Sequence, residues 1–153
     1  MSTLDAKFIR WVQQSVYKHV ENLKGTWLLF LEGEIRQTDK VPAWVELRMD
    51  GPYFFHLNKN YWRAYIEVNA LVSLVTHTDL YGLARISGEV NSILSRPILA
   101  KEYEDGEELI GCFQTLDDIR EGSRVSNFGQ IDPKNKLQQA TVEVHYEMFF
   151  TKE

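Results

Sequence analysis

The sequence predicts an α+β fold: a mainly antiparallel sheet with two amphipathic helices packed on one face and a long loop or hairpin excursion. Three patterns predict it. Two segments carry apolar residues at helical spacing, several segments alternate apolar and polar residues, and a polar stretch precedes the last alternating segment. The 153 residues, 44% of them hydrophobic, match the usual size of one domain and suffice to bury a core. We therefore expect a single domain over residues 1–153.

The first helix is expected over residues 4–23. Its apolar stripe consists of Leu4, Phe8, Val12, Val16, Val20 and Leu23, at spacings of three and four. Thr3 is a candidate N-cap, and Gly25 stands where helices commonly stop. The apolar run 27–31 follows this stop, and it predicts a short buried strand.

Two alternating segments predict the next strands. Residues 43–49 alternate as a half-buried strand does, until Asp50-Gly51-Pro52 breaks the pattern. Residues 62–75 alternate for longer than any other segment in this part of the chain. Such a length suits a central antiparallel strand.

A second helix and a hairpin are expected in the third quarter of the chain. Thr78 or Asp79 can cap the helix, which should end before Arg96-Pro97. Its apolar face consists of Leu80, Leu83, Ile86, Val90, Ile93 and Leu94. Residues 98–103 and 109–115 then flank Asp105-Gly106, the best short hairpin signal in the sequence, so we expect a hairpin with an acidic tip.

The last quarter of the chain divides into an excursion and a strand. In residues 116–138, charged residues, glycines and an Asp132-Pro133 turn outnumber apolar residues, which predicts a long loop or an irregular excursion. Residues 140–150 alternate apolar and polar side chains again and predict a long final strand.

Composition excludes several classes of function. The 22 acidic and 17 basic residues give a net charge of −5, which argues against a surface that coats phosphate backbones. Cys112 is the only cysteine, so neither an intrachain disulfide nor a multi-thiolate metal site can form, and a reducing compartment fits best. The longest fully apolar stretch, 27–31, is far shorter than a membrane span, and no signal-peptide pattern opens the sequence.

The residues that usually carry chemistry do not form a recognisable site. The histidines are His19, His56, His77 and His145, and none has the spacing of zinc ligands. His77 and Asp79 fit a base with its orienting carboxylate, but more simply a strand end that meets a helix cap. Ser87-Gly88 lacks the glycine before a nucleophile elbow, and the acidic run 102–108 lacks the ligand pattern of a calcium loop. We expect no catalytic, cofactor-binding or metal-binding residue, and no enzyme.

Aromatic residues gather in the first half of the chain. They include Trp11, Trp27, Trp44, Trp62, Tyr53, Phe54, Phe55, Tyr61 and Tyr65. Without clusters of Lys and Arg they do not fit a single-strand nucleic-acid binder, so we expect them in the core or in a subunit interface. The face of the 62–75 strand that carries Tyr65 and Leu71 either meets a partner or is covered by a helix.

The order of these elements resembles the tail terminator (tail completion) proteins of long-tailed bacteriophages. The residues that carry the likeness are 44–52 (Trp-Val-Glu-Leu-Arg-Met-Asp-Gly-Pro), 63–69 (Arg-Ala-Tyr-Ile-Glu-Val-Asn), 79–94 and 141–150. The likeness spans most of the chain, and it rests on element order and hydrophobic pattern rather than on an invariant motif.

The resemblance implies a structural virion protein that forms a ring, expected to be hexameric. Such a ring caps the tail tube, ends tail polymerisation and joins the tail to the head completion or neck proteins. It implies assembly in the host cytoplasm, a place at the head-proximal end of the tail and no cofactor. DNA would pass through the lumen without sequence-specific binding, which suits a net acidic chain. Residues 116–138 would contact the tube or a neighbour, and 102–108 the lumen or the ring's face.

Two other readings stay open. A small-molecule-binding or enzymatic α+β domain would show a deep pocket lined by Trp and Tyr with one perturbed carboxylate. A sheet-forming adaptor of another, secretion-like contractile machine would show the same sequence features as a tail ring protein, and only its binding partners would distinguish the two.

Overall fold

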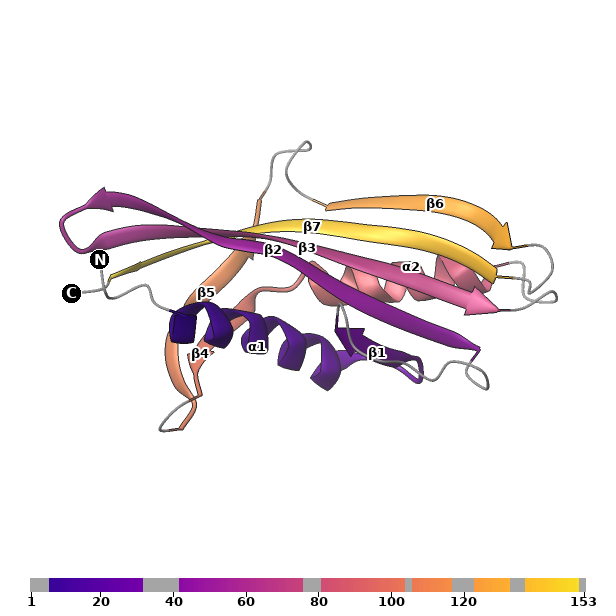
Figure 1. The fold of residues 1–153 in the computed structure, drawn as a ribbon, viewed down its shortest axis with the longest axis horizontal. Coiled ribbons are helices and arrows are strands. Elements are labelled where there is room, and N and C mark those ends of the chain that lie inside the picture. The colour runs from indigo at the N-terminus through magenta and orange to yellow at the C-terminus, as the bar shows by residue number, and fades with distance from the viewer. Residues whose placement is uncertain are drawn as a thin grey trace.

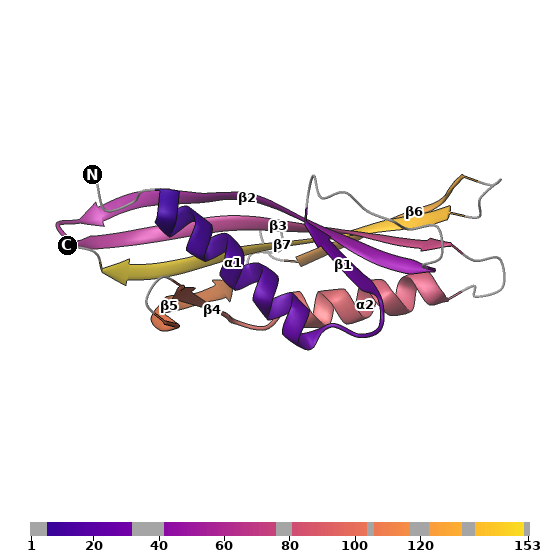
Figure 2. The same ribbon diagram turned by 60° about the horizontal axis from the view of Figure 1, so that its bottom comes forward.

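A computed structural model describes residues 6–31, 42–75, 81–103, 106–116, 123–132 and 137–151. In these residues the predicted α+β class is confirmed, with two helices and a curled mixed sheet (Figure 1). The elements are α1 (Ala6–Leu23), β1 (Leu28–Leu31), β2 (Ala43–Asn58), β3 (Tyr61–Val75), α2 (Gly82–Leu94), β4 (Ile98–Glu102), β5 (Glu108–Thr115), β6 (Ser123–Asp132) and β7 (Leu137–Thr151). Figure 2 shows both helices on the same side of β2, β3 and β7.

The strand order is β1-β2-β3-β7-β5-β4, and β6 also pairs with β7. β1 runs parallel to β2, whereas the β2–β3, β3–β7, β5–β7, β6–β7 and β4–β5 pairs are antiparallel. β7 lies against β3 along its whole length. Its other edge is divided between β6, which pairs with 137–144, and β5, which pairs with Tyr146 and Glu147. The β4–β5 hairpin therefore leaves the sheet beside the start of β6, where Ser123 pairs with Val144.

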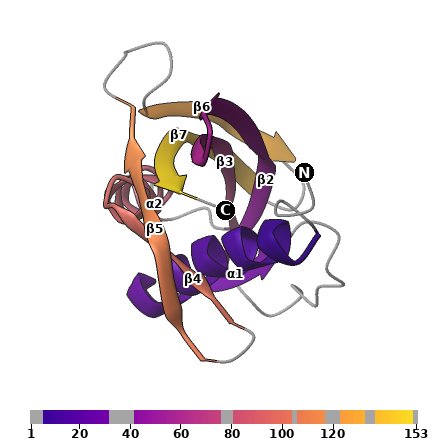
Figure 3. The same cartoon turned by 90° about the vertical axis from the view of Figure 1, so that its left-hand side faces the viewer.

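The core fills the concave side of the sheet, between the strands and the helices (Figure 3). The alternation predicted for the two long strands is confirmed, because every second residue is buried from Trp62 to Leu74 in β3 and from Ala140 to Phe150 in β7. Phe8 of α1 packs on Phe150 at a ring-centroid distance of 5.2 Å and on Phe54 at 5.4 Å. The helix stripe and the strand alternation thus meet in one hydrophobic cluster.

The predicted end of the second strand at Asp50-Gly51-Pro52 is wrong, because β2 continues to Asn58. Gly51 has a φ of 104°, and the pairing with β3 shifts register between Asp50 and Tyr53. A glycine with positive φ lets the strand bulge and resume instead of stopping. After the bulge, Phe54 points back toward the core.

The long loop predicted for 116–138 is wrong for residues 123–132, which form β6. β6 pairs antiparallel with β7, with irregularities between Asn127 and Gly129 and between Gln130 and Asp132. The fold prediction gave a hairpin excursion as the alternative to a long loop, and the antiparallel β6–β7 pair corresponds to that alternative. An edge strand is stabilised by backbone hydrogen bonds on one side only, so it forms without the regular apolar alternation that marks β3.

The predicted ends of helices and strands agree with the structure less well than their central residues do. The buried strand predicted at 27–31 is an edge strand in which only Leu29 is buried, while Leu28 and Leu31 are exposed. The N-cap of α2 is Tyr81, without a side-chain cap bond. The predicted caps Thr3, Thr78 and Asp79 lie outside the described residues. None of the described helices is long and apolar enough to cross a lipid bilayer.

Candidate interaction surfaces

The outer face of the β2–β3–β7 sheet lies opposite the helices. Its cross-strand rows follow from the register, for example Asp50, Glu67 and His145, or Tyr53, Tyr65 and Glu147. Neither α1 nor α2 covers this face (Figure 3), so the predicted alternative of a helix over Tyr65 is wrong. The outer face carries polar and aromatic side chains, of which Glu46 and Ser73 are buried.

The register brings His145 between two carboxylates that the spacing of the histidines did not reveal. His145 Nε2 lies 3.2 Å from Oε1 of Glu143, and His145 Nδ1 lies 3.9 Å from Oε1 of Glu67. The Tyr65 hydroxyl lies 2.6 Å from His145 Nδ1 and 2.9 Å from Oε1 of Glu67. Glu67, Glu143 and His145 offer metal-ligand atoms within 4.8 Å of one another. However, the two ring nitrogens face different carboxylates, which suits a hydrogen-bonded ladder better than one shared ion.

The other histidines are separate from this cluster. His19 Nε2 lies 2.9 Å from the carbonyl oxygen of Ile93, and His56 stacks on Trp62 at 4.4 Å between ring centroids. His77 lies outside the described residues. The sequence indicated that Glu143 and His145 share a face, because residues i and i+2 of a strand do so. Their partner from β3, Glu67, is identified only by the register between β3 and β7.

The end of the β2–β3 hairpin exposes a group of apolar side chains, here called the aromatic end. Its members are Tyr53, Phe55, Leu57, Tyr61 and Phe149, each between 41% and 49% exposed. Tyr61 stacks on Phe149 at 6.0 Å. The Tyr53 hydroxyl donates to Asp50 Oδ1, and this bond, with the charge of Asp50, raises the pKa of Tyr53. Exposed apolar groups of this extent are typical of contact surfaces.

The cation Arg63 lies beside the aromatic end. The Arg63 guanidinium lies 5.5 Å from the centre of the Phe55 ring and 5.4 Å from that of Tyr65, and its Nε donates to Glu147 Oε2 at 2.8 Å. Arg63 thus joins the exposed rings to the acidic rows of the outer face. By contrast Trp11, Trp27 and Trp62 are buried, as expected for core aromatics.

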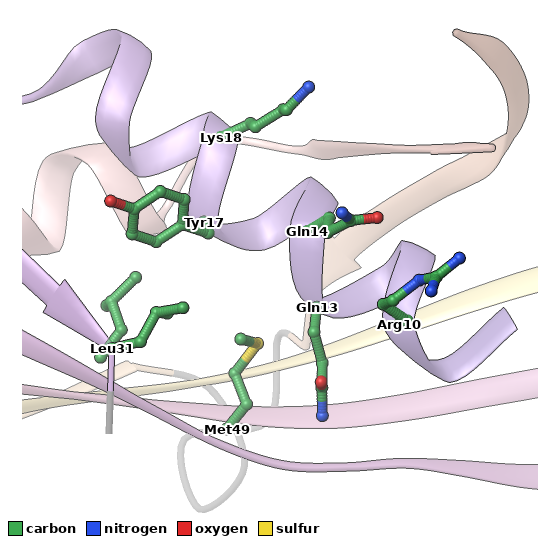
Figure 4. A pocket seen from close by; sticks show the side chains of 8 residues that line it. Arg10, Gln13, Gln14, Tyr17, Lys18, Leu31 and Met49 are labelled. Atoms are coloured by element: carbon green, nitrogen blue, oxygen red, sulfur yellow. The ribbon is translucent and has the colours of Figure 1, made fainter. Parts of the chain in front are cut away.

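A cleft of about 470 Å³ lies between α1 and the β1–β2 pair, here called the α1 cleft. The α1 side contributes Arg10, Gln13, Gln14, Tyr17 and Lys18, and the strands contribute Leu31, Leu47 and Met49 (Figure 4). Its lining thus combines apolar side chains from the strands with cationic and amide groups from the helix. No tryptophan and no carboxylate line it among the described residues. It therefore differs from the Trp- and Tyr-lined enzymatic pocket with a perturbed carboxylate.

The acidic hairpin predicted around residues 102–108 is confirmed as the β4–β5 pair, which projects away from the main sheet (Figure 1). Ile98, Ala100 and Phe113 are fully buried on its inner side. Leu99 and Leu109 are exposed. The hairpin is thus a projecting arm with an apolar core contact, exposed leucines and an acidic tip.

Comparisons with known proteins identify the fold alone. No family model matches the chain, and no curated protein matches it. A solved structure whose designation names no activity is similar at a TM-score of 0.54 and 7% sequence identity. The match covers 92% of this chain and 98% of that one. The two chains therefore share an arrangement of elements over almost their whole lengths.

Proposed function

We propose that this chain is the ring-forming subunit that caps the tail tube of a long-tailed bacteriophage. In this proposal the ring, taken as a hexamer, ends tail polymerisation and joins the tail to the head completion proteins. The protein is structural, needs no cofactor and resides at the head-proximal end of the virion tail. Its sheet is taken as mainly antiparallel, with both helices on one face, as in the tail terminators that the sequence resembles.

The observation that supports the proposal most is the presence of unlike contact surfaces on separate parts of one small domain. The aromatic end, the projecting β4–β5 hairpin and the α1 cleft each expose apolar groups on regular strands or helices. A head-to-tail ring needs two different patches on every subunit, and a ring that also meets a tube and a head needs more. An isolated enzyme has no such requirement.

Charge is consistent with a DNA-conducting lumen. The described outer face carries Asp50, Glu67 and Glu143, while its cations Arg48 and Arg63 are paired with Glu46 and Glu147. A surface with excess negative charge does not bind the phosphate backbone, so DNA would slide past it. We propose that part of the acidic surface faces the lumen.

The first experiment is the solution mass of the purified protein by light scattering coupled to size exclusion, over a wide range of concentration and salt. We expect the mass of six 17.9 kDa subunits, with a central hole in electron micrographs. Because a ring can also close only on its tube, the same protein is added to isolated tail tubes and scored for density at one end. A stable dimer that leaves tube ends bare would contradict the proposal.

The α1 cleft favours the alternative of a small-molecule-binding domain. Its apolar lining and the cationic Arg10 would suit an amphipathic anion. The discriminating measurement is the unfolding temperature with and without a medium-chain fatty acid. A rise that saturates and that Arg10→Gln abolishes would favour this alternative, while an unchanged unfolding temperature favours the ring.

A further inference from the structure

The β4–β5 hairpin carries the two most exposed leucines of the described residues. Leu99 is 51% and Leu109 is 59% exposed, although both lie in paired strands rather than in a loop. The buried neighbours Ile98 and Ala100 show that strand alternation turns Leu99 away from the core. The hairpin therefore presents apolar groups that its own domain leaves uncovered.

These leucines are held in a fixed place. The backbone N–H of Lys101 donates to Ser15 Oγ at 3.0 Å, and Ser15 Oγ donates to the carbonyl oxygen of Trp11 at 2.8 Å. Gly111 passes so close to Met148 that an added Cβ would lie 2.6 Å from its sulfur. Docking of a surface that is already ordered costs little conformational entropy.

The hairpin also carries a charge conflict. Glu102 and Glu108 are direct cross-strand partners, and neither has an ion pair within the part of the chain that the structure describes. Like charges placed opposite each other destabilise a strand pair, so a cation from a partner would relieve it. Glu107 lies 3.6 Å from both Lys18 and Lys101, but its side chain is 58% exposed, and such contacts are weak.

The α1 cleft has the complementary chemistry. Leu31, Leu47 and Met49 offer an apolar wall, and Arg10 has no ion-pair partner among the described residues. Figure 4 shows Leu31 and Met49 opposite Tyr17, and Arg10 beside Gln13 at the other end of the cleft. Leu109 follows Glu108, whose cross-strand partner is Glu102, so an exposed leucine beside this carboxylate pair matches the apolar wall and Arg10 in polarity and charge.

The hairpin and the Arg10 end of the cleft lie on different sides of α1, although Lys18, at the other end of the cleft, lies 3.6 Å from Glu107 of the same copy's hairpin. Ser15 meets the hairpin, whereas Arg10 lines the cleft, and five residues along a helix separate their directions by well over a quarter turn. We infer that the β4–β5 hairpin of one copy docks in the α1 cleft of the next copy, with the leucines on the apolar wall and Glu102 and Glu108 near Arg10. This inference rests on the proposed ring and names its head-to-tail subunit contact.

A charge exchange tests the contact. One variant, Glu102→Lys with Glu108→Lys, reverses the charge of the cross-strand pair, and the other, Arg10→Glu, reverses the charge of the cleft cation that faces it. Each variant alone pairs like charges, so we expect its self-association to weaken about tenfold or more. An equimolar mixture restores opposite charges at every contact. It should recover the wild-type mass in light scattering, and the mixed particles should contain both variants by native mass spectrometry.

Controls separate this contact from other effects. Leu109→Ser should weaken association, whereas Tyr81→Ser, at a side chain that is 79% exposed and far from the hairpin in sequence, should not. Circular dichroism checks that every variant is folded. If wild-type rings form and the charge variants associate as well as wild type, the contact is wrong while the ring stands. Wild-type protein that stays monomeric up to about 1 mM also overturns the contact. The addition of protein to isolated tail tubes then tests the proposed ring independently of this contact.

Discussion

The hydroxyl of Tyr146, in the middle of β7, donates a hydrogen bond to the carbonyl oxygen of Leu94, the last residue of α2. Carbonyls in the last turn of a helix lack partners within the helix. A second side chain acts at the same place, because His19 of α1 lies 2.9 Å from the carbonyl oxygen of Ile93. The C-terminal end of α2 is therefore fixed to the sheet and to α1 by two side chains.

Replacement of Tyr146 by phenylalanine should destabilise the fold by about 1–2 kcal/mol, because a buried carbonyl loses its donor while the ring remains. The measurement is the free energy of unfolding in urea. Tyr61→Phe is the matched control, since Tyr61 is 41% exposed and should change stability by less than about 0.5 kcal/mol. Equal effects of the two substitutions would contradict the role of the Leu94 contact.

The same tyrosine predicts how stability depends on pH. Burial raises the pKa of Tyr146 above its ordinary value of 10.0. Above pH 10 the unfolded chain loses this proton while the folded chain keeps it, so the folded state binds more protons and stability falls as pH rises. Urea unfolding at pH 9, 10 and 11 should show this decline. In Tyr146→Phe the decline should be shallower, and an unchanged slope would speak against a buried, protonated hydroxyl.

Gly111→Ala should destabilise the fold by about 1–3 kcal/mol, because the new Cβ would lie 2.6 Å from the sulfur of a buried Met148. Gly88→Ala is the control of opposite sign. Gly88 is an exposed residue of α2 with nothing within 4 Å of an added Cβ, so alanine should stabilise by about 0.5–1 kcal/mol. Both changes are read from the urea midpoint, and a neutral Gly111→Ala would mean that Met148 moves away freely.

Addition of Zn²⁺ or removal of metals with EDTA should leave the unfolding temperature unchanged. The two ring nitrogens of His145 face Glu143 on one side and Tyr65 with Glu67 on the other. Binding at one hundred times the dissociation constant would add about 2.7 kcal/mol, which a thermal scan detects easily. A clear rise that His145→Gln abolishes would instead identify a metal site on the outer face.

Much of the fold could be predicted because the spacing of apolar residues along the sequence determines its helices and long strands. The stripe that contains Phe8 and Val12 and the alternation of residues 62–75 each report one buried face. The acidic hairpin could also be placed, since Asp105-Gly106 is a strong turn signal between two apolar runs. The spacing of apolar residues did not predict β6 or the continuation of β2 past the bulge after Asp50. At both places backbone pairing, rather than the side-chain pattern, decides the structure.

The proposed contact surfaces divide in the same way. Exposure of Leu99 follows from alternation with Ile98 and Ala100, so one half of the contact had a local signal. The α1 cleft had none, because Arg10 and Tyr17 meet Leu31 and Met49 only after the helix has packed beside β1 and β2. The His145 cluster likewise depends on the register between β3 and β7.

The sequence by itself determined the helix stripes, the long alternating strands, the acidic charge and the position of the β4–β5 hairpin, because each is a property of neighbouring residues. Only the tertiary structure decided that β7 divides its second edge between β5 and β6, that Tyr146 reaches Leu94, and that a cationic cleft lies beside α1. The physical reason is that strand pairing and helix packing bring together residues far apart in the chain, and many pairings satisfy the same local pattern.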